Sequence, residues 1–288
     1  MKSEGVIVAA HGRHYRVELT HGEILLCFPR GKKSDLACGD RVTVERSSET
    51  QGVIDEVLPR RTLLFRSDRF RQKLIAANVS QIVIVVATMP AFSEELITRC
   101  LVAAESQGID ALIVLNKCDL TDRVAQAREA LNPFLNLGYP VLELSARACV
   151  DTLNHRLLGH TSVFVGQSGM GKSTLINALI PEANARTKEI SIALDSGKHT
   201  TTNAALYRLD TGSAIIDSPG LQEFGLHHLS MQEMELGFRE FHSLIGRCRF
   251  RNCRHDHEPG CAIQEELENG HVSETRYAVF RALSNEIA

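Results

Sequence analysis

The strongest chemical signal in the chain is the glycine-rich segment GQSGMGKST, which spans residues 166–174. It fits the pattern G-x-x-x-x-G-K-[ST] and stands between the runs TSVFV and STLINALI, which predict a strand followed by a helix. Glycines let successive backbone N–H groups face inward and bind an anion at the start of a helix. We therefore expect a loop that binds the phosphates of a nucleotide. The alternative is a glycine-rich turn without a ligand.

The residue types in this segment predict a role for each part. Lys172 brings a positive charge to the β- and γ-phosphates, and the hydroxyl of Ser173 is a ligand for Mg²⁺. The nucleotide-binding residues predicted here are Gly166, Gln167, Ser168, Gly169, Met170, Gly171, Lys172, Ser173 and Thr174.

A second motif indicates the base. The apolar run ALIVL ends in Asn116, Lys117, Cys118 and Asp119. A carboxylate accepts two hydrogen bonds, which suits the N1–H and N2–H₂ donors of guanine and not the edge of adenine. We expect Asp119 to bind the base, the aliphatic part of Lys117 to cover it, and Asn116 to brace the loop.

Three further segments complete a nucleotide site. The run PVLEL ends in Ser145 and Ala146, and the N–H of Ala146 can donate to guanine O6. The run SAIID ends in Asp217, which can hold a water ligand of Mg²⁺, and the N–H of Gly220 can contact the γ-phosphate. In the polar segment KHTTT, Thr201 is predicted to complete the Mg²⁺ shell. The magnesium residues are thus Ser173, Thr201 and Asp217.

The residue that orients the attacking water is harder to assign. Leu221, directly after D-S-P-G, cannot orient water, and Gln222 follows it. We predict that His199 does so, with Gln222 as the alternative, and Thr200 stays an alternative to the neighbouring threonine as magnesium ligand. The catalytic residues predicted are His199, Lys172, Thr201 and Gly220.

The order of these motifs is unusual. The base-binding motifs at 116 and 145 precede the phosphate loop at 166, whereas an ordinary GTPase has the phosphate loop first. A circular permutation keeps every strand in place and moves only the termini, which generally lie at the surface. We therefore expect one permuted domain whose D-S-P-G segment leads directly into the C-terminal residues.

Near the C-terminus, Cys248, Cys253, His255 and Cys261 have the composition of a metal site. Three thiolates and one imidazole are a common zinc set, and four protein ligands indicate one structural ion. His257 is the alternative to His255. Arginines around the cluster favour RNA as a partner; they are Arg247, Arg249, Arg251 and Arg254.

The remaining sequence predicts the elements that position these motifs. Residues 1–62 contain five short apolar or alternating runs separated by turns, which favour an oligonucleotide-binding barrel over a plain sheet. From 63 to 228 strands and helices alternate, which indicates a largely parallel sheet covered on both faces. Residues 229–288 are mainly helical around the cysteine cluster. The basic run at 58–73 is either a solvated linker or a contact to a phosphate backbone.

Composition narrows the setting. No apolar run approaches the length of about 18 residues that a membrane span needs, and the N-terminus lacks a signal-peptide core. We expect a cytoplasmic monomer without a membrane partner. In a reducing compartment the scattered cysteines are best explained as small buried hydrophobic residues; they are Cys27, Cys38, Cys100, Cys118 and Cys149.

Taken together, the motifs resemble one family, the ribosome small-subunit-dependent GTPase A, also called RsgA or YjeQ. The resemblance covers the whole chain and rests on the permuted order N-K-C-D, S-A-R, G-Q-S-G-M-G-K-S-T, G-K-H-T-T-T, D-S-P-G and on the cysteine–histidine cluster. It implies an N-terminal oligonucleotide-binding barrel, a permuted GTPase domain and a C-terminal zinc domain.

The resemblance also implies an activity and a partner. These are GTP hydrolysis stimulated by the small ribosomal subunit and a role late in that subunit's maturation, with docking on rRNA in the GTP form and release after hydrolysis. One alternative is an RNA-binding protein that uses GTP as a structural switch with little turnover. Another is a GTPase that delivers metal, against which four protein ligands argue.

Overall fold

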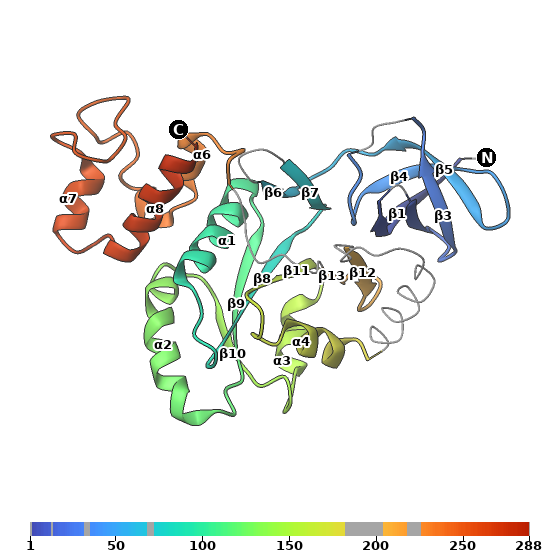
Figure 1. Ribbon diagram of the computed structural model, residues 1–288, viewed down its shortest axis with the longest axis horizontal. Helices are drawn as coiled ribbons and strands as arrows, with labels where there is room; N and C mark the ends of the chain where they lie inside the picture. The colour runs from blue at the N-terminus through green and yellow to red at the C-terminus, as the bar shows by residue number, and fades with distance from the viewer. Residues whose placement is uncertain are drawn as a thin grey trace.

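The computed structural model describes residues 2–12, 14–31, 35–67, 72–181, 204–217 and 226–287. A β-barrel, a central sheet with its helices, and a group of C-terminal helices follow one another along the chain. Figure 1 shows the barrel and the C-terminal helices on opposite sides of the upper end of the central sheet. This three-part arrangement, with the sheet between a barrel and a helical region, is the one that the sequence predicts, while the boundaries at 62/63 and 228/229 stay predictions.

The barrel consists of five strands: β1 (Lys2–His11), β2 (His14–Leu19), β3 (Ile24–Pro29), β4 (Arg41–Arg46) and β5 (Gln51–Val57). β1 pairs with both β2 and β4, and β3 runs parallel to β5, so the order β1-β2-β3-β5-β4 closes on itself. Every second residue of β2 is buried, as expected for strands with one face on a core. This closed five-stranded order is that of an oligonucleotide-binding barrel and not of a plain sheet.

The basic run after the barrel forms a hairpin that the sequence did not predict. Its strands are β6 (Leu63–Ser67) and β7 (Gln72–Ala77). Just before it, Arg60 donates two hydrogen bonds to the fully buried carboxylate of Asp40, at 2.7 and 2.8 Å. At least this arginine is therefore committed to structure and not to a nucleic acid.

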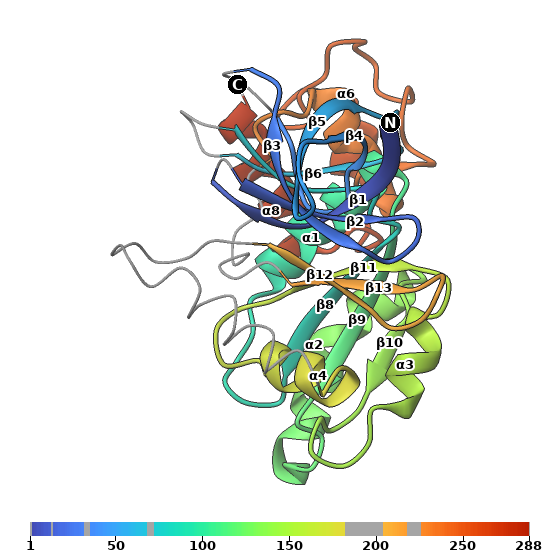
Figure 2. The same ribbon diagram turned by 90° about the vertical axis from the view of Figure 1, so that its right-hand side faces the viewer.

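The central sheet has the order β10-β9-β8-β11-β13-β12. The strands β8 (Gln81–Ala87), β9 (Asp110–Asn116), β10 (Val141–Glu143), β11 (Thr161–Val165) and β13 (Ala214–Asp217) are parallel, and β12 (Ala205–Arg208) is antiparallel. Every residue of β8 is buried, because helices cover both faces of the sheet. β1 of the barrel also pairs with β12, at Ala9 and Ala205, so the barrel continues the sheet (Figure 2).

Among the described residues, the helices that flank this sheet are α1 (Glu94–Gln107), α2 (Thr121–Asn136), α3 (Asp151–Leu157) and α4 (Lys172–Leu179). α1 and α2 contribute to one apolar cluster, while α3 and α4 contribute to a second cluster against the other face. The Ser93 hydroxyl accepts the N–H of Leu96 at the start of α1, and Gly108 ends the helix in the left-handed conformation. The predicted two-sided covering is thus confirmed.

The C-terminal region contains α6 (Met231–Leu236), a short 3₁₀ helix (Arg239–Phe241), α7 (Ala262–Glu268) and α8 (Glu274–Ile287). The helical character predicted for residues 229–288 is therefore present in short helices with turns between them. α6 ends at Gly237, where a Cβ would lie 2.6 Å from Cγ1 of Val102 in α1. Glycine therefore permits α6 to approach α1 closely and the chain to turn away. Among the described residues, no helix is long and apolar enough to cross a membrane.

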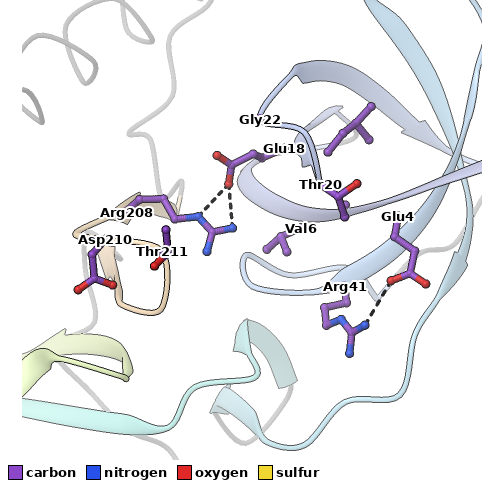
Figure 3. Close-up of a pocket in the computed structure, with 11 residues that line it drawn as sticks. Glu4, Val6, Glu18, Thr20, Gly22, Arg41, Arg208, Asp210 and Thr211 are labelled. Carbon is purple, nitrogen blue, oxygen red and sulfur yellow. Dashed lines mark hydrogen bonds and ion pairs between the residues drawn. The ribbon is translucent and has the colours of Figure 1, made fainter.

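A cleft of about 600 Å³ lies between the barrel and the turn that joins β12 to β13 (Figure 3). An ion pair joins Arg208 of β12 to Glu18 of β2 beside this cleft, with a distance of 2.8 Å. A second pair, between Arg41 and Glu4, joins two barrel strands at 3.3 Å. Both arginines are more than two-fifths exposed, so charged groups border a cleft that is open to solvent.

Candidate active site and metal centre

The predicted phosphate loop occupies the strand-to-helix turn between β11 and α4. Gly166 and Gly171 have φ values of 150° and 93°. A Cβ at Gly166 would lie 2.2 Å from the carbonyl oxygen of Val85, and one at Gly171 would lie 2.3 Å from Nδ2 of Asn116. Only glycine fits at both places, because the loop lies directly against β8 and the end of β9.

The electrostatics of this loop suit an anion and a cation together. Nζ of Lys172 is half-buried and donates to the carbonyl oxygens of Gly166 and Gln167, the second at 2.9 Å. Burial lowers the pKa of Lys172, and the nearby carboxylate of Asp217 partly opposes this. Burial likewise raises the pKa of Asp217, and Lys172 partly opposes that shift. Phosphates beside Lys172 and a cation beside Asp217 would stabilise the charged form of each.

The predicted base-binding motifs meet the phosphate loop in a pocket of about 240 Å³. Residues at the ends of β9 and β10 and at the start of α4 form this pocket. The lining residues are Asn116, Lys117, Asp119, Leu120, Ser145, Ala146, Arg147, Gly171 and Thr174. Leu120 and Arg147 were not predicted as site residues, although each directly follows a predicted one.

Asn116 ties the three motifs together. Its side chain is buried, and Nδ2 donates to the carbonyl oxygen of Met170 at 3.0 Å. Its Oδ1 accepts the N–H groups of Lys117 and Ala146, at 2.8 and 3.0 Å. The N–H of Ala146, predicted to donate to guanine O6, is therefore hydrogen-bonded to Asn116 in this structure.

Lys117 and Asp119 of the same motif also line this pocket. Lys117 has a left-handed backbone, with φ of 62°, and Nζ donates to the carbonyl oxygens of Met89 and Gly169, both at 2.7 Å. Its aliphatic chain therefore lies along the pocket between two loops. Asp119 is exposed, and a hydrogen bond from Ser145 lowers its pKa. The carboxylate is thus ionised and open to two donors at neutral pH.

Several predicted residues lie outside the described part of the chain. These are the catalytic and magnesium candidates His199, Thr200, Thr201, Gly220 and Gln222. Their segments are attached at described points, because β12 begins at Ala205 and β13 ends at Asp217, beside the phosphate loop.

The four predicted metal ligands lie together: one ligand atom from each of Cys248, Cys253, His255 and Cys261 comes within 4.8 Å of every other. Nδ1 of His255 is 3.3 Å from Sγ of Cys261 and 3.5 Å from Sγ of Cys248. The side chain of His257, the alternative ligand, is 92% exposed and faces Asp256. The group therefore includes His255.

The five scattered cysteines differ in their surroundings. Cys27, Cys38 and Cys100 are buried, as predicted, and Cys118 is partly buried. Cys149 is exposed, so the prediction that all five are buried is wrong for this residue. It lies in the turn after β10, and its thiol accepts the N–H of Asp151 at 3.4 Å.

Known proteins share this arrangement. The profile of the RsgA GTPase family matches residues 57–227. The small ribosomal subunit biogenesis GTPase RsgA of Burkholderia pseudomallei is 53% identical over 290 residues, which cover 99% of this chain and 92% of that protein. The RsgA of Nitrosospira multiformis is 53% identical over 279 residues, which cover 97% of this chain and 89% of that protein.

Solved structures agree in fold. YjeQ from Thermotoga maritima has a TM-score of 0.76 and 32% identity, with 100% of this chain and 99% of that chain covered. YloQ, described as a circularly permuted GTPase, has a TM-score of 0.72 and 26% identity, with coverage of 100% and 95%. Sequence, permuted motif order and fold lead to one conclusion: the chain belongs to the RsgA GTPase family.

Proposed function

We propose that this GTPase hydrolyses GTP on the small ribosomal subunit, late in that subunit's maturation, and leaves the subunit after hydrolysis. The observation that carries the nucleotide part is Asn116, whose side chain joins the base pocket to the phosphate loop. The names of the relatives, small ribosomal subunit biogenesis GTPases, support the ribosomal part. We further propose that the protein works in the cytoplasm as a monomer.

The site residues have separate roles in this proposal. Asp119 accepts hydrogen bonds from the guanine edge, and Lys172 binds the β- and γ-phosphates. The hydroxyl of Ser173 and the carboxylate of Asp217 suit Mg²⁺, which prefers oxygen ligands. When bound, Mg²⁺ neutralises charge on the phosphates. Thr201 would complete its shell, and the N–H of Gly220 would contact the γ-phosphate.

The water-orienting residue is proposed to be His199. It stands two residues before Thr201 in a polar segment that precedes β12. The β12 strand pairs with β13, which carries Asp217 at its end, so the segment is attached beside the Mg²⁺ site. Orientation of the attacking water is a large part of what a GTPase site adds to positioned phosphates.

We also propose that the cysteine–histidine group holds one structural zinc ion. Zn–S bonds of about 2.3 Å at tetrahedral angles place two sulfurs about 3.8 Å apart. The Sγ atoms of Cys248 and Cys261 are 3.9 Å apart. Four protein ligands complete the coordination, so no position is open for a substrate.

Two surfaces suit RNA. In the segment 248–261, which carries the four predicted metal ligands, Phe250 is 42% exposed. The Arg249 guanidinium lies 5.5 Å from the centre of its ring, and further arginines of this segment are exposed. An exposed ring next to positive charge can stack on a base while the charge binds phosphate. On the barrel, Ile24 and Leu26 of β3 are exposed, and barrels of this type bind oligonucleotides over the strands β2 and β3.

Steady-state GTP hydrolysis with and without purified small ribosomal subunits tests the proposal. We expect slow turnover alone and much faster turnover with subunits. Lys172→Ala should abolish both rates, since the charge acts on the phosphates and not on the apolar core. His199→Ala should bind GTP normally and lose only the stimulated rate; if it is stimulated normally, Gln222 becomes the candidate. Equal turnover with and without subunits would refute the ribosomal part.

A further inference from the structure

The histidine of the metal group has a partner on each ring nitrogen. Nδ1 of His255 faces the cysteine sulfurs, at 3.3 and 3.5 Å. On the other side of the ring, Nε2 lies 3.1 Å from Oε1 of Glu235 in α6. The two side chains are only 8% and 15% exposed, so water competes little for this contact.

This arrangement has a definite chemical meaning. A neutral imidazole has one N–H and one lone pair, and the bond made by the N–H decides which nitrogen can bind a metal. A carboxylate that accepts the N–H fixes the tautomer and makes the ligand nitrogen more basic. On the proposed zinc site, we therefore propose that Glu235 is the positioning residue that holds Nε2–H of His255 and directs Nδ1 to the metal.

The backbone of His255 is held independently of the metal. Its φ of 58° is left-handed, which is uncommon for a residue with a side chain. Its carbonyl oxygen accepts hydrogen bonds from Nε2 of Gln264 at 3.0 Å and from the hydroxyl of Tyr277 at 2.5 Å. These bonds from α7 and α8 hold the tight turn between Cys253 and the histidine.

The ring is therefore oriented by three helices: α6 through Glu235, and α7 and α8 through the backbone. In the described part of the chain, α6 is the first helix after β13, and a capping box between Ser230 and Glu233 fixes its start. A bond between α6 and the metal ligand means that metal binding also holds this helix in place. Loss of the ion should loosen α6 together with residues 248–261.

Zinc affinity of the full-length protein, measured by competition with a chromophoric chelator, tests the role of Glu235. Glu235→Ala should weaken zinc binding about 10–100-fold, the usual effect of losing such a partner. Glu235→Gln keeps an acceptor oxygen but not the charge, so its zinc affinity should lie between those of the wild type and Glu235→Ala. Glu265→Ala is the matched control, because it removes an exposed carboxylate from α7 close to Cys261. It should bind zinc like the wild type.

Two further measurements separate positioning from other roles. With Co²⁺ in the site, Glu235→Ala should keep the absorption of a tetrahedral three-sulfur, one-nitrogen centre, because all four ligands remain. In the wild type, ¹⁵N chemical shifts of His255 should show the proton on Nε2 and the metal on Nδ1. Both readouts work without GTP turnover.

The outcomes distinguish this inference from the zinc proposal itself. A wild-type protein that binds no zinc would refute the metal site. Tight zinc binding in the wild type with the same affinity in Glu235→Ala, or metal on Nε2, would overturn the role of Glu235 and leave the metal site intact. Unchanged binding of a GTP analogue will show that the variants are folded. If Glu235→Ala does not fold, the comparison of zinc affinities is made with the isosteric Glu235→Gln instead.

Discussion

The C-terminal helices and the barrel are joined to the central sheet in opposite ways. Phe238 and Phe280 of the C-terminal region belong to the same buried apolar cluster as Leu101 of α1 and Phe134 of α2. The barrel strands instead enclose a core of their own, which includes Val17 and its neighbours. The first joint is thus a shared core and the second a contact between two cores.

The C-terminal joint also contains a buried ion pair. Arg276 of α8 is 2% exposed and binds both carboxylate oxygens of Glu240, while its Nη1 lies 3.3 Å from the hydroxyl of Thr98 in α1. Its guanidinium lies over the ring of Phe238, with 5.1 Å to the ring centre, and at 5.6 Å over Phe134. Charge, hydrogen bonds and aromatic faces therefore fix α8 against α1 and α2.

The barrel joint combines backbone contacts and exposed polar groups with a small apolar contact, in which Cys38 joins the cluster of the central sheet and Val6 and Val8 of β1 pack against it. The N–H of Ala77 donates to the carbonyl of Cys38 at 2.9 Å, and Nδ2 of Asn78 donates to that of Gly39 at 2.9 Å. Beyond these, β1 meets β12, and the exposed pair between Arg208 and Glu18 borders the cleft. We infer that the C-terminal helices move with α1 as one body, while the barrel can shift against the sheet at lower cost.

The largest effect should come from breaking the buried pair. Arg276→Met leaves the carboxylate of Glu240 buried without its partner, which typically costs about 3–5 kcal/mol of unfolding free energy. Chemical denaturation measures the loss. Peptide-resolved hydrogen exchange should show α1 and α8 becoming less protected together, with β1–β5 unchanged.

The double variant Arg276→Met, Glu240→Leu is its control. With both charges replaced by apolar side chains, no group is left buried and unpaired, so most of the lost stability should return. If the single variant exposes α8 to exchange while α1 stays fully protected, the helices do not form one body.

A smaller effect is expected at the barrel joint. Gly39 has φ of 90°, and a Cβ there would lie 2.2 Å from the carbonyl oxygen of Ala77 and 3.3 Å from Cδ1 of Ile216. Gly39→Ala should therefore cost about 2–4 kcal/mol, from the left-handed backbone and from overpacking. Because Ile216 precedes Asp217, GTP binding should weaken as well.

Gly22 offers a matched control, since its φ is 88° and a Cβ there would meet nothing within 4 Å. Gly22→Ala should cost only the backbone strain, about 1–2 kcal/mol, and leave GTP binding unchanged. Equal losses of stability in the two variants would mean that the contact with Ala77 can relax freely.

These joints also mark what the sequence could and could not reveal. The phosphate loop, the base motifs and the order of strands follow from short local patterns, and the structure gathers Asn116, Asp119 and Gly171 around one pocket. Local patterns carry this information because each motif sits at the end of an apolar strand, and parallel strands end at the same edge.

Contacts between segments that are distant in the chain leave no such local pattern in the sequence. Nothing in the spacing of Glu235 or Arg276 shows that one faces His255 and the other Glu240. The predicted boundary at 228/229 treats the C-terminal helices as a separate domain, which stays a prediction. The core of these helices is shared with α1 and α2, so deletion of residues 229–288 would expose Phe134. Point variants therefore test the role of the C-terminal helices better than a deletion does.

The smallest effect should come from the exposed pair beside the cleft. Glu18→Gln removes the charge opposite Arg208, and exposed pairs contribute only about 0.2–1 kcal/mol, which salt screens. The unfolding free energy should therefore barely change. Since the pair bridges β2 and β12, peptides covering residues 4–10 and 204–209 should nevertheless exchange faster at low salt, and the difference should vanish at high salt.

Glu4→Gln is the control, because Glu4 pairs with Arg41 within the barrel and borders the same cleft. If both variants left exchange at β12 unchanged, the backbone pairing of β1 with β12 would alone hold the barrel in place, and the barrel would be as firmly attached as the C-terminal helices.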